Sequence, residues 1–537
     1  MTKKQYYLAS ICLIVIFLVF TNILYLWSAL AAPSGSSYTG INLAASADKL
    51  VYYSMIEQGR LGQLLQKNIH TSELQVGSLI GPHWWLIGQT ANLFSLGVIP
   101  VYHGWRILLV LVTMVVLFFW LRRLTSKYNE RLWLWLFVLF AGGWGWAKAL
   151  FQPSILASDF APLTTKPVDI YMGELSLQAN AQQSPLFILS HILLLLVFYL
   201  WIKQRQTISW QSESLVGALA ALLIMVHPYD FWILATIPAL WSLWRWWQTQ
   251  DRRYLYKLSI YWFWCAASAG LVWGLVMSET ALRGWSAQNL VYSPPPYNYL
   301  LAWGLLFPLA VIGTYHWWTK WRDNEWWRLL VIWTWVTWIM VYLPLDYNRR
   351  LANGWLIPVS LVAGLGALAL ARRIQNYYWQ IIYWLFVIMA VTFGPWYSQT
   401  VYLRAMSYYQ TNDRFYLSAE TKELLGSLKQ QPVEQIVLPF DEPIGLLIPA
   451  FTGQTIYIGH QHQTINYLQK RQKADEFFSA NTGLDKIKFL VDNRISLIVV
   501  HYTTKNPAEF FSWLDEAPYL QLIKKNSTGA IYRLHQQ

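Results

Sequence analysis

The stretch LASICLIVIFLVFTNILYLWSAL, residues 8–30, is a long apolar run that follows Lys3 and Lys4. A helix of this length can cross the hydrocarbon core of a bilayer. The end of the run, from Ala29 to Ala31, also resembles a signal-peptide cleavage site, but the run is longer than the apolar region of most signal peptides. We therefore predict a retained first transmembrane helix.

Further apolar runs extend this interpretation to most of the chain. Of its 537 residues, 55% are hydrophobic and 12% are charged, and this charged share is about half that of a soluble protein. The 34 tryptophans and 33 tyrosines are typical of proteins whose rings collect at membrane interfaces. The later apolar runs are residues 101–121, 132–151, 184–202, 213–227, 231–247, 258–278, 298–318, 327–344, 354–371 and 377–396. The pattern predicts a polytopic α-helical membrane protein of about 11 transmembrane helices.

Lysine and arginine indicate the orientation of these helices. The formal charge of +13 comes mostly from short loops rather than from one basic face, so nucleic-acid binding is not expected. The positive-inside rule places the basic loops in the cytoplasm together with the N-terminus. We therefore expect a multi-pass plasma-membrane protein whose extracytoplasmic side carries loops 31–100, 152–183 and 279–297 and everything after residue 397. The basic residues on the cytoplasmic side are Lys3, Lys4, Arg122, Arg123, Lys127, Arg131, Lys203, Arg205, Arg252, Arg253, Lys257, Lys320, Arg322, Arg372 and Arg373.

The composition changes near Leu417 to alternating short strands and helices. We expect residues 1–400 to form the transmembrane domain and residues 401–537 to form a soluble extracytoplasmic α/β domain. The predicted strands are 435–438, 455–458, 496–500 and 530–534, and the predicted helices are 419–429, 470–479 and 507–515. The two cysteines, Cys12 and Cys265, lie in apolar runs, so they provide neither a disulfide framework nor a thiolate metal site.

The first long loop contains two predicted helices. Ser46 to Gly62 is typical of a helix with Ser46 as its N-cap. Pro82 to Leu96 is a second, tryptophan-rich helix, and we place it in the membrane interface because an additional crossing would invert every later loop. In the third apolar run, Gly142-Gly143-Trp144-Gly145 indicates close helix packing rather than a site.

The order of features in the first third of the chain resembles the GT-C superfamily of glycosyltransferases that use lipid-linked sugars, especially the protein mannosyltransferase and aminoarabinose transferase branch. The resemblance implies that Asp48 is the catalytic base. That branch commonly has an acidic pair at this point, whereas Lys49 follows Asp48 here, so a metal held by paired carboxylates is not supported. The residues that carry the resemblance are Ala47-Asp48, Tyr52-Tyr53, Ile56, Gly59, Gly62, Pro82-His83-Trp84-Trp85 and Gly88.

Elementary chemistry gives Asp48 a role independently of the resemblance. Glycosyl transfer from a polyprenyl phosphate needs a base for the proton of the acceptor hydroxyl, and one carboxylate suffices because phosphate is already a good leaving group. The alternative is that Asp48 only favours the N-terminal dipole of its helix. Tyr52 lies on the same predicted helix face and is a candidate pocket residue, whereas Glu57 lies about 180° around the helix and is expected to be solvated.

Two adjacent arginines, Arg349 and Arg350, oppose the positive-inside bias at the external end of two predicted helices. Arginine forks bind phosphate oxygens in a bidentate manner, so we expect this pair to bind the donor phosphate. The alternatives are contact with lipid headgroups or pairing with Asp346. In another external turn, His227 is a candidate phosphate ligand and Asp230 a candidate pocket residue. Turn formation alone explains this four-residue sequence nearly as well.

Other candidate pocket residues are less specific. The loop 152–183 contains Asp159, Asp169 and Glu174, any of which could instead be a solvated loop residue. His460 and His462 follow a predicted strand, where ligands dock in α/β folds. Packing of that turn on the transmembrane domain is the alternative interpretation.

The resemblance implies an inverting glycosyltransferase that moves a sugar from a polyprenyl-phosphate donor to a glycan, lipid or protein acceptor on the extracytoplasmic face. The external carboxylate and the outward arginines fit such a reaction with an anionic lipid. We further expect the carboxyl of Asp48 and the guanidinium groups of Arg349 and Arg350 to meet in one water-accessible cavity. No cofactor is implied. A divalent metal is possible, but the sequence has no acidic pair that would support one. The alternative function is a transporter or flippase of lipid-linked saccharides, but the sequence has no internal repeat of the kind that such carriers show.

Overall fold

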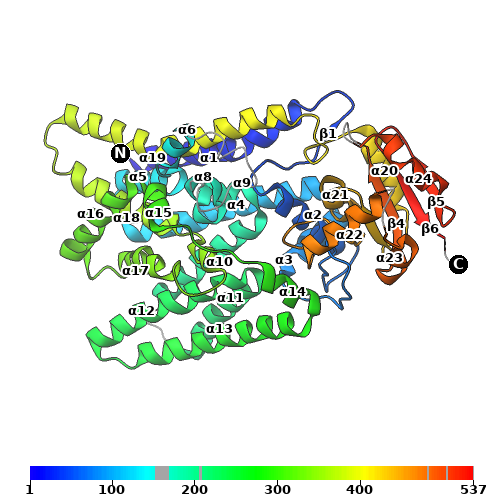
Figure 1. Ribbon diagram of the computed structural model, residues 1–537. Coiled ribbons are helices and arrows are strands. Elements are labelled where there is room, and N and C mark those ends of the chain that lie inside the picture. Colours follow the sequence, from blue (N-terminus) through cyan, green and yellow to red (C-terminus); the bar gives the residue numbers. More distant parts are fainter. Residues whose placement is uncertain (152–167, 205–208, 480–482, 503–505, 536–537) are drawn as a thin grey trace. The chain divides into compact units, whose positions relative to one another are not determined.

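The computed structural model describes residues 1–151, 168–204, 209–479, 483–502 and 506–535 (Figure 1). Its contacts divide the chain into two compact units. The first unit comprises Met1–Leu24, Trp105–Val272 and Leu290–Ala405, and the second comprises Tyr25–Gly104, Trp273–Asn289 and Met406–Gln537. The predicted C-terminal segment thus shares its unit with parts of two predicted external loops.

Long apolar helices account for the predicted membrane runs. Within the described residues, six spans are long and apolar enough to cross a membrane, and a pair bent by 79° can add a seventh. The six are α1 (Lys3–Leu30), α4 (Val98–Leu124), α5 (Tyr128–Phe140) continued by α6 (Gly145–Phe151), α10 (Pro185–Lys203), α13 (Arg253–Ser278) and α19 (Tyr377–Tyr408). The bent pair is α15 (Pro296–Trp303) with α16 (Leu306–His316), the latter extended by η4 (Trp317–Trp321). The chain is therefore a multi-pass membrane protein.

The remaining predicted runs also form helices, but they are shorter or less apolar. These helices are α11 (Trp210–Val226), α12 (Phe231–Thr249), α17 (Glu325–Met340) and α18 (Leu356–Ala371). Every predicted run therefore coincides with a helix or a helix pair, while the total of eleven crossings stays a prediction. Short elements connect the helices: α8 (Val168–Tyr171), η1 (Gly173–Leu175), α9 (Leu177–Gln183), η3 (Pro228–Asp230) and η5 (Asn348–Ala352).

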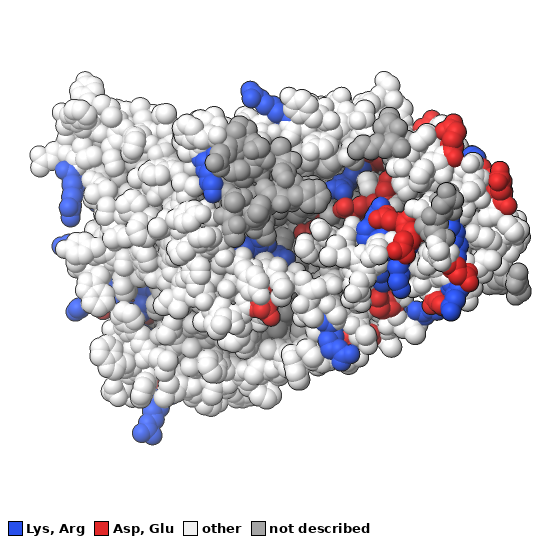
Figure 2. All heavy atoms as spheres, in the orientation of Figure 1, with Lys and Arg blue, Asp and Glu red and all other residues white. Residues whose placement is uncertain are grey.

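The surfaces of these helices have the apolar character that lipid requires. Large apolar side chains such as Leu8, Ile11, Val15 and Val19 are exposed along α1. Figure 2 shows an almost uncharged surface over the long helices, whereas acidic and basic side chains gather over the C-terminal strands and helices. Burial of apolar surface in hydrocarbon rather than in a protein core thus accounts for the unusual composition.

The Gly142–Gly145 run breaks the third predicted span between α5 and α6. A Cβ atom at Gly143 would lie 2.0 Å from the carbonyl oxygen of Ala302, so only glycine allows this approach. The backbone N–H of Gly142 donates to the carbonyl of Val391, and that of Trp144 donates to the carbonyl of Leu301. The predicted role of this run in close packing is therefore confirmed.

The second unit contains the helices of the first long loop. They are α2 (Ser46–Arg60) and α3 (Pro82–Leu93), and they pack closely because a Cβ atom at Gly88 would lie 2.5 Å from the carbonyl oxygen of Ile56. The predicted cap is wrong, since Ala45 is the N-cap in a left-handed conformation and makes no side-chain cap bond. Ser46 is already inside the helix and accepts a hydrogen bond from Arg414.

Two sheets complete this unit. The larger has the order β3-β4-β6-β5, in which β3 (Ile436–Pro439) and β4 (Ile495–His501) are parallel, and β6 (Gly529–Leu534) is antiparallel to both β4 and β5 (Leu520–Lys525). The smaller pairs β1 (Ser37–Tyr38) with β2 (Tyr416–Leu417). The other helices of the second unit are α14 (Thr280–Gln288), α20 (Ala419–Lys429), α21 (Glu442–Thr452), α22 (Tyr467–Phe478), α23 (Lys486–Asp492), η6 (Ala508–Phe511) and α24 (Ser512–Glu516).

Three of the four predicted C-terminal strands are present, but the strand predicted at 455–458 is wrong. The N–H of Ile456 donates to the carbonyl of Ile69, and only an isolated bridge joins Ile456 to Val437. This bridge consists of two bonds, from the Val437 N–H to the Thr455 carbonyl and from the Tyr457 N–H to the Val437 carbonyl, and the pairing does not continue into a strand. The core of the larger sheet contains a group of buried aromatic side chains, Phe477, Phe478, Phe489 and Phe511.

Candidate functional site

Asp48 lies in the first turn of α2, and its side chain is 47% exposed. One carboxylate oxygen, Oδ1, lies 3.3 Å from Nε2 of His460. The structure therefore brings together the predicted base and one of the predicted pocket histidines, both within the second unit. An accessible carboxylate that is oriented by a neighbour is suited to accept a proton from a substrate.

The turn that carries His460 determines which ring nitrogen bears hydrogen. Nδ1 of His460 accepts hydrogen bonds from the backbone N–H groups of His462 and Gln463, at 3.0 and 3.2 Å. A neutral imidazole with an acceptor at Nδ1 carries its proton on Nε2. Nε2 of His460, which faces Asp48, is therefore the ring nitrogen that bears hydrogen.

A second histidine, His70, lies next to the turn that carries His460. His70 is fully buried, and both burial and the neighbouring His460 lower its pKa well below the usual value, so His70 is neutral. Its Nε2 lies 3.1 Å from Oγ of Ser54 on α2. Its carbonyl accepts a 2.7 Å hydrogen bond from Thr464, which anchors the His460 turn to the first long loop.

Two further predicted residues lie in this unit. Tyr52 stacks on Trp84 of α3, with ring centroids 4.8 Å apart. His462 is exposed, its ring lies 6.0 Å from that of His460, and its carbonyl accepts a hydrogen bond from Gln288 of α14. We call Asp48, His460, His70 and Ser54 the Asp48 cluster.

Glu57 is not solvated as predicted, because only 1% of its side chain is exposed. Arg60 forms two hydrogen bonds to its carboxylate and Lys429 forms a third. Burial alone would raise the pKa of Glu57, but these bonds outweigh burial and lower it. Glu57 and Asp48 were correctly predicted to lie on different faces of α2. The sequence did not show that Lys429 of α20 covers the face that carries Glu57.

Arg349 and Arg350 lie on η5 in the first unit. Arg350 forms an ion pair with Glu174, and its guanidinium lies 5.7 Å from the ring centroid of Tyr229. Burial alone would raise the pKa of Glu174, but the charges of Arg350 and Arg349 lower it. Asp346, the partner considered in the sequence, accepts a hydrogen bond from Tyr292 instead.

Asp230 and His227 form a buried group beside η5. Asp230 is fully buried and lies 3.1 Å from Nδ1 of His227. Its carboxylate also accepts hydrogen bonds from Ser190, at 2.5 Å, and from Asn353, at 2.9 Å. Burial would raise the pKa of Asp230, but His227 and these donors lower it, so the group stays charged.

Sequence reasoning missed the polar partners of Asp230. Ser190 and His191 are consecutive in the apolar helix α10, and His191 contacts Asn180 and Asn353 at 3.0 and 3.2 Å. Polar residues within an apolar span indicate a functional site or a buried polar network, so Ser190 and His191 could have been recognised from the sequence. We call Arg349, Arg350, Glu174 and Asp230, together with the Asp230 partners His227, Ser190 and Asn353, the Arg350 cluster.

The remaining candidates in the loop 152–183 have separate outcomes. Asp159 lies outside the described residues. Asp169 accepts a 3.1 Å hydrogen bond from the N–H of Gly145, and burial raises its pKa to about 7. At neutral pH, Asp169 is therefore divided between protonated and charged forms, unlike Glu174.

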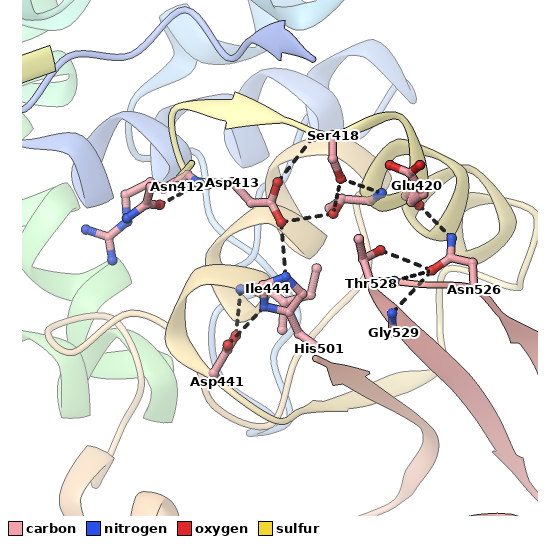
Figure 3. Close-up of polar contacts among 12 residues, drawn as sticks. Asn412, Asp413, Ser418, Glu420, Asp441, Ile444, His501, Asn526, Thr528 and Gly529 are labelled. Atoms are coloured by element: carbon pink, nitrogen blue, oxygen red, sulfur yellow. Dashed lines mark hydrogen bonds and ion pairs between the residues drawn. The ribbon is translucent and has the colours of Figure 1, made fainter. Parts of the chain in front are cut away.

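A further charged group joins three segments of the second unit (Figure 3). Both ring nitrogens of His501, at the end of β4, contact carboxylates: Nδ1 lies 3.1 Å from Asp441, and Nε2 lies 3.0 Å from Asp413. Burial would lower the pKa of His501, but the two carboxylates raise it to about 10. Asp413 also accepts from Thr421 and Asp441 caps α21, so the group fastens the connector after α19 to the sheet.

The structure thus gathers some of the candidates into two clusters, one in each unit, and leaves Tyr52, His462 and Asp169 outside them. The predicted meeting of Asp48 with Arg349 and Arg350 stays a prediction. Within the part of the chain that the structure describes, no group of three or more His, Cys, Asp or Glu side chains is arranged to hold a metal ion.

Comparisons with known proteins identify the fold. No protein-family model matches the chain, and no curated protein matches it in sequence. The Archaeoglobus fulgidus oligosaccharyltransferase AglB, solved with an inhibitory peptide and a dolichol-phosphate, is 13% identical, with a TM-score of 0.55 over 100% of this chain and 75% of that chain. The apo form of the A. fulgidus oligosaccharyltransferase is 12% identical, with a TM-score of 0.53 over 92% of this chain and 69% of that chain. ArnT from Cupriavidus metallidurans in the apo state is 11% identical, with a TM-score of 0.47 over 96% of this chain and 97% of that chain.

At 12–13% identity, the likeness to the oligosaccharyltransferase concerns the fold and not the reaction. It extends over nearly the whole chain, including the first long loop and the C-terminal elements. The chain therefore has the fold of the archaeal oligosaccharyltransferase, in agreement with the fold that the resemblance to the GT-C superfamily implies.

Proposed function

We propose that this protein is an inverting glycosyltransferase that moves a sugar from a polyprenyl-phosphate donor to an acceptor on the extracytoplasmic face of the plasma membrane. The observation that carries the proposal is the exposed carboxylate of Asp48, oriented by His460, in a chain with the fold of a lipid-dependent oligosaccharyltransferase. The acceptor can be a glycan, a lipid or a protein.

In the proposed reaction, Asp48 takes the proton of the acceptor hydroxyl as that oxygen attacks the anomeric carbon of the donor. The new carbon–oxygen bond forms on the face opposite the phosphate, the bond to the phosphate oxygen breaks, and polyprenyl phosphate leaves with the electron pair. General-base catalysis of this kind contributes about 10²–10⁴-fold to rate. Nε2 of His460 lies 3.3 Å from Oδ1 of Asp48, and we propose that this contact orients the carboxylate.

Arg349 and Arg350 are proposed to bind the donor phosphate and to stabilise the charge that grows on it during transfer. Glu174 pairs with Arg350 at this proposed phosphate site. His227, paired with Asp230, is proposed to support the same phosphate. Separate roles in lining the acceptor or sugar pocket are proposed for Tyr52, Asp159, Asp169, Glu174, Asp230, His460 and His462.

The experiment is transfer of radiolabelled sugar from polyprenyl-phosphate donors in proteoliposomes that contain the full-length protein. Wild type is compared with Asp48→Asn, which keeps the shape of the side chain and removes its basicity. We expect Asp48→Asn to lower kcat by at least about 100-fold and to leave the apparent Tm nearly unchanged, because the side chain is half exposed. An Asp48→Asn protein that is folded and transfers sugar at the wild-type rate would remove Asp48 from the mechanism.

The same proteoliposomes distinguish the enzyme from a carrier. A flippase moves lipid-linked saccharide between leaflets without forming a new glycosidic bond. Movement of labelled donor in wild type and in Asp48→Asn, without product in either, would replace the transferase with a carrier.

A further inference from the structure

A cavity of about 410 Å³ lies in the second unit at the ends of α2 and α3. Its lining includes the charged residues Glu57, Arg60 and Lys429, and the turn from Asn92 to Val98. Asp48 lies in the first turn of α2 and Arg60 ends the helix, so about 18 Å of helix separates this cavity from the Asp48 cluster. The cavity is therefore a second location and not part of the proposed catalytic site.

The charges of this cavity do not cancel. Arg60 and Lys429 both contact the buried carboxylate of Glu57, through bonds of 2.6–2.8 Å. Two cations and one carboxylate leave a net charge of +1, and the other lining residues are uncharged. Cations at the ends of α2 and α20 also offset the helix dipoles, but this does not require an open cavity beside them.

The turn at the edge of the cavity exposes a group of large apolar side chains. Leu93 is 77% exposed, Phe94 64% and Leu96 41%. Immediately after this turn, Val98 begins α4, one of the spans that are apolar enough to cross a membrane. The cavity therefore lies where a transmembrane helix leaves the hydrocarbon, which is the level of lipid headgroups.

We propose that this cavity binds the phosphate of an anionic glycerophospholipid, with Lys429 and Arg60 at the headgroup and Leu93, Phe94 and Leu96 among the acyl chains. The combination of a surplus cation with exposed apolar side chains at a span end fits an amphipathic anion better than a soluble one. This site is independent of sugar transfer, and its ligand is a structural lipid rather than the donor.

The test measures binding of headgroup-labelled phosphatidylglycerol to the full-length protein in detergent. Lys429→Gln removes the surplus charge and leaves the two bonds between Arg60 and Glu57. Lys422→Gln is the matched control, because Lys422 is an exposed lysine on the same helix and lies outside the cavity. One cation at a lipid phosphate contributes about 1 kcal/mol, so we expect Lys429→Gln to weaken binding about fivefold and Lys422→Gln to leave it unchanged.

A second variant avoids the Glu57 ion pairs altogether. A Cβ atom at Gly97 would have only Pro100 within 4 Å, at 3.8 Å, so the position tolerates a side chain. Gly97→Glu places an anion in the cavity and should abolish phosphatidylglycerol binding, whereas Gly97→Ser should retain it.

Three outcomes would overturn the proposal. The first is equal binding by wild type, Lys429→Gln and Gly97→Glu. The second is Lys429-dependent binding of inorganic phosphate without binding of phosphatidylglycerol, which would make this a site for free phosphate. The third is Lys429-dependent binding of undecaprenyl phosphate alone, which would assign the cavity to the donor lipid.

Discussion

At the scale of single residues, Asp48 and Glu57 show how environment divides the roles of two carboxylates on one helix. Asp48 is half exposed and has the His460 ring 3.3 Å from Oδ1, whereas Glu57 is buried and held by two cations. A carboxylate that already satisfies Arg60 and Lys429 is a poor proton acceptor. The accessible carboxylate is therefore the one available for substrate chemistry.

His460 should act as a positioning residue for Asp48. His460→Ala removes the imidazole that lies 3.3 Å from the Asp48 carboxylate, and we expect kcat for sugar transfer to fall about tenfold, or ~1.4 kcal/mol. The KM for the donor should stay the same. His460→Gln can again donate an N–H toward Asp48 and should recover part of the loss; equal rates for the Ala and Gln variants would contradict this role.

His501 should make the stability of the protein depend on pH. Its pKa is raised from the usual 6.5 to about 10 in the folded chain, so its stabilising contribution is fully present below pH 6.5 and is lost as pH rises toward 10. We expect the difference in Tm between wild type and His501→Gln to be largest near pH 6 and to narrow steadily by pH 10.

At pH 6, removal of a charged hydrogen-bonding partner should cost about 2–3 kcal/mol. The measurement is thermal unfolding of both proteins in detergent over this pH range. A difference in Tm that is constant with pH, or that grows as pH rises, would show that His501 is not protonated between Asp413 and Asp441.

The sequence located candidate residues better than it located their partners. Asp48 and Arg350 stand out because their type conflicts with their surroundings in the chain. Their contacts to His460 and Glu174 join positions hundreds of residues apart, and one sequence does not contain that information. Asn353 is different, since it lies only three residues after Arg350, but its uncharged side chain gave no sign of the bond to Asp230.

At the scale of elements, the contact between α2 and α3 sets the geometry of the Asp48 cluster. Gly88 of α3 lies against the backbone of Ile56 and Gly59 of α2, while Tyr52 stacks on Trp84 further along the same contact. The helix that carries Asp48 is therefore fixed by backbone contact and by one aromatic pair.

Gly88→Ala should consequently destabilise the protein. The added methyl group would lie 2.5 Å from backbone atoms of α2, and overpacking of this kind costs about 1–3 kcal/mol. Gly426→Ala is the control, because Gly426 lies in α20 with no atom within 4 Å of the added Cβ, and a helical alanine there should stabilise by up to about 1 kcal/mol. A loss of Tm in both variants, or in neither, would contradict the packing argument.

Elements were predictable where their own residues determine them. Each apolar run became a helix, because backbone hydrogen bonds must be satisfied within the run. The strand predicted at 455–458 failed: this segment pairs with β3 through one bridge only, and the N–H of Ile456 bonds to Ile69 of the first long loop. Helix α21 was missed because its sequence contains Pro443 and Pro449, although Asp441 caps it and the first proline occupies its first turn, where no N–H is needed.

At the scale of the whole molecule, the sequence predicts one orientation in the membrane from the distribution of lysine and arginine. This orientation and the total of about eleven crossings depend on each other, because each additional crossing inverts all later loops. The fold of an oligosaccharyltransferase agrees with a multi-pass protein but leaves the orientation as a prediction.

Cysteine labelling in intact cells should determine the orientation. In a chain whose Cys12 and Cys265 are replaced by serine, Lys422→Cys should react with a membrane-impermeant maleimide from outside, and Lys127→Cys should react only after the membrane is made permeable. Both lysines are exposed in the folded chain. The reverse pattern would place the C-terminal elements in the cytoplasm and invert the topology.

The central claim is that the carboxylate of Asp48 and the guanidinium groups of Arg349 and Arg350 act on one donor molecule. It is tested most directly by a cryo-EM structure of the protein with a non-hydrolysable polyprenyl-phosphate sugar. We expect the phosphate oxygens to lie about 3 Å from Arg349 or Arg350, with the anomeric carbon facing a space that Asp48 also lines. A bound donor whose phosphate contacts neither arginine, or whose sugar lies far from Asp48, would contradict the proposed mechanism.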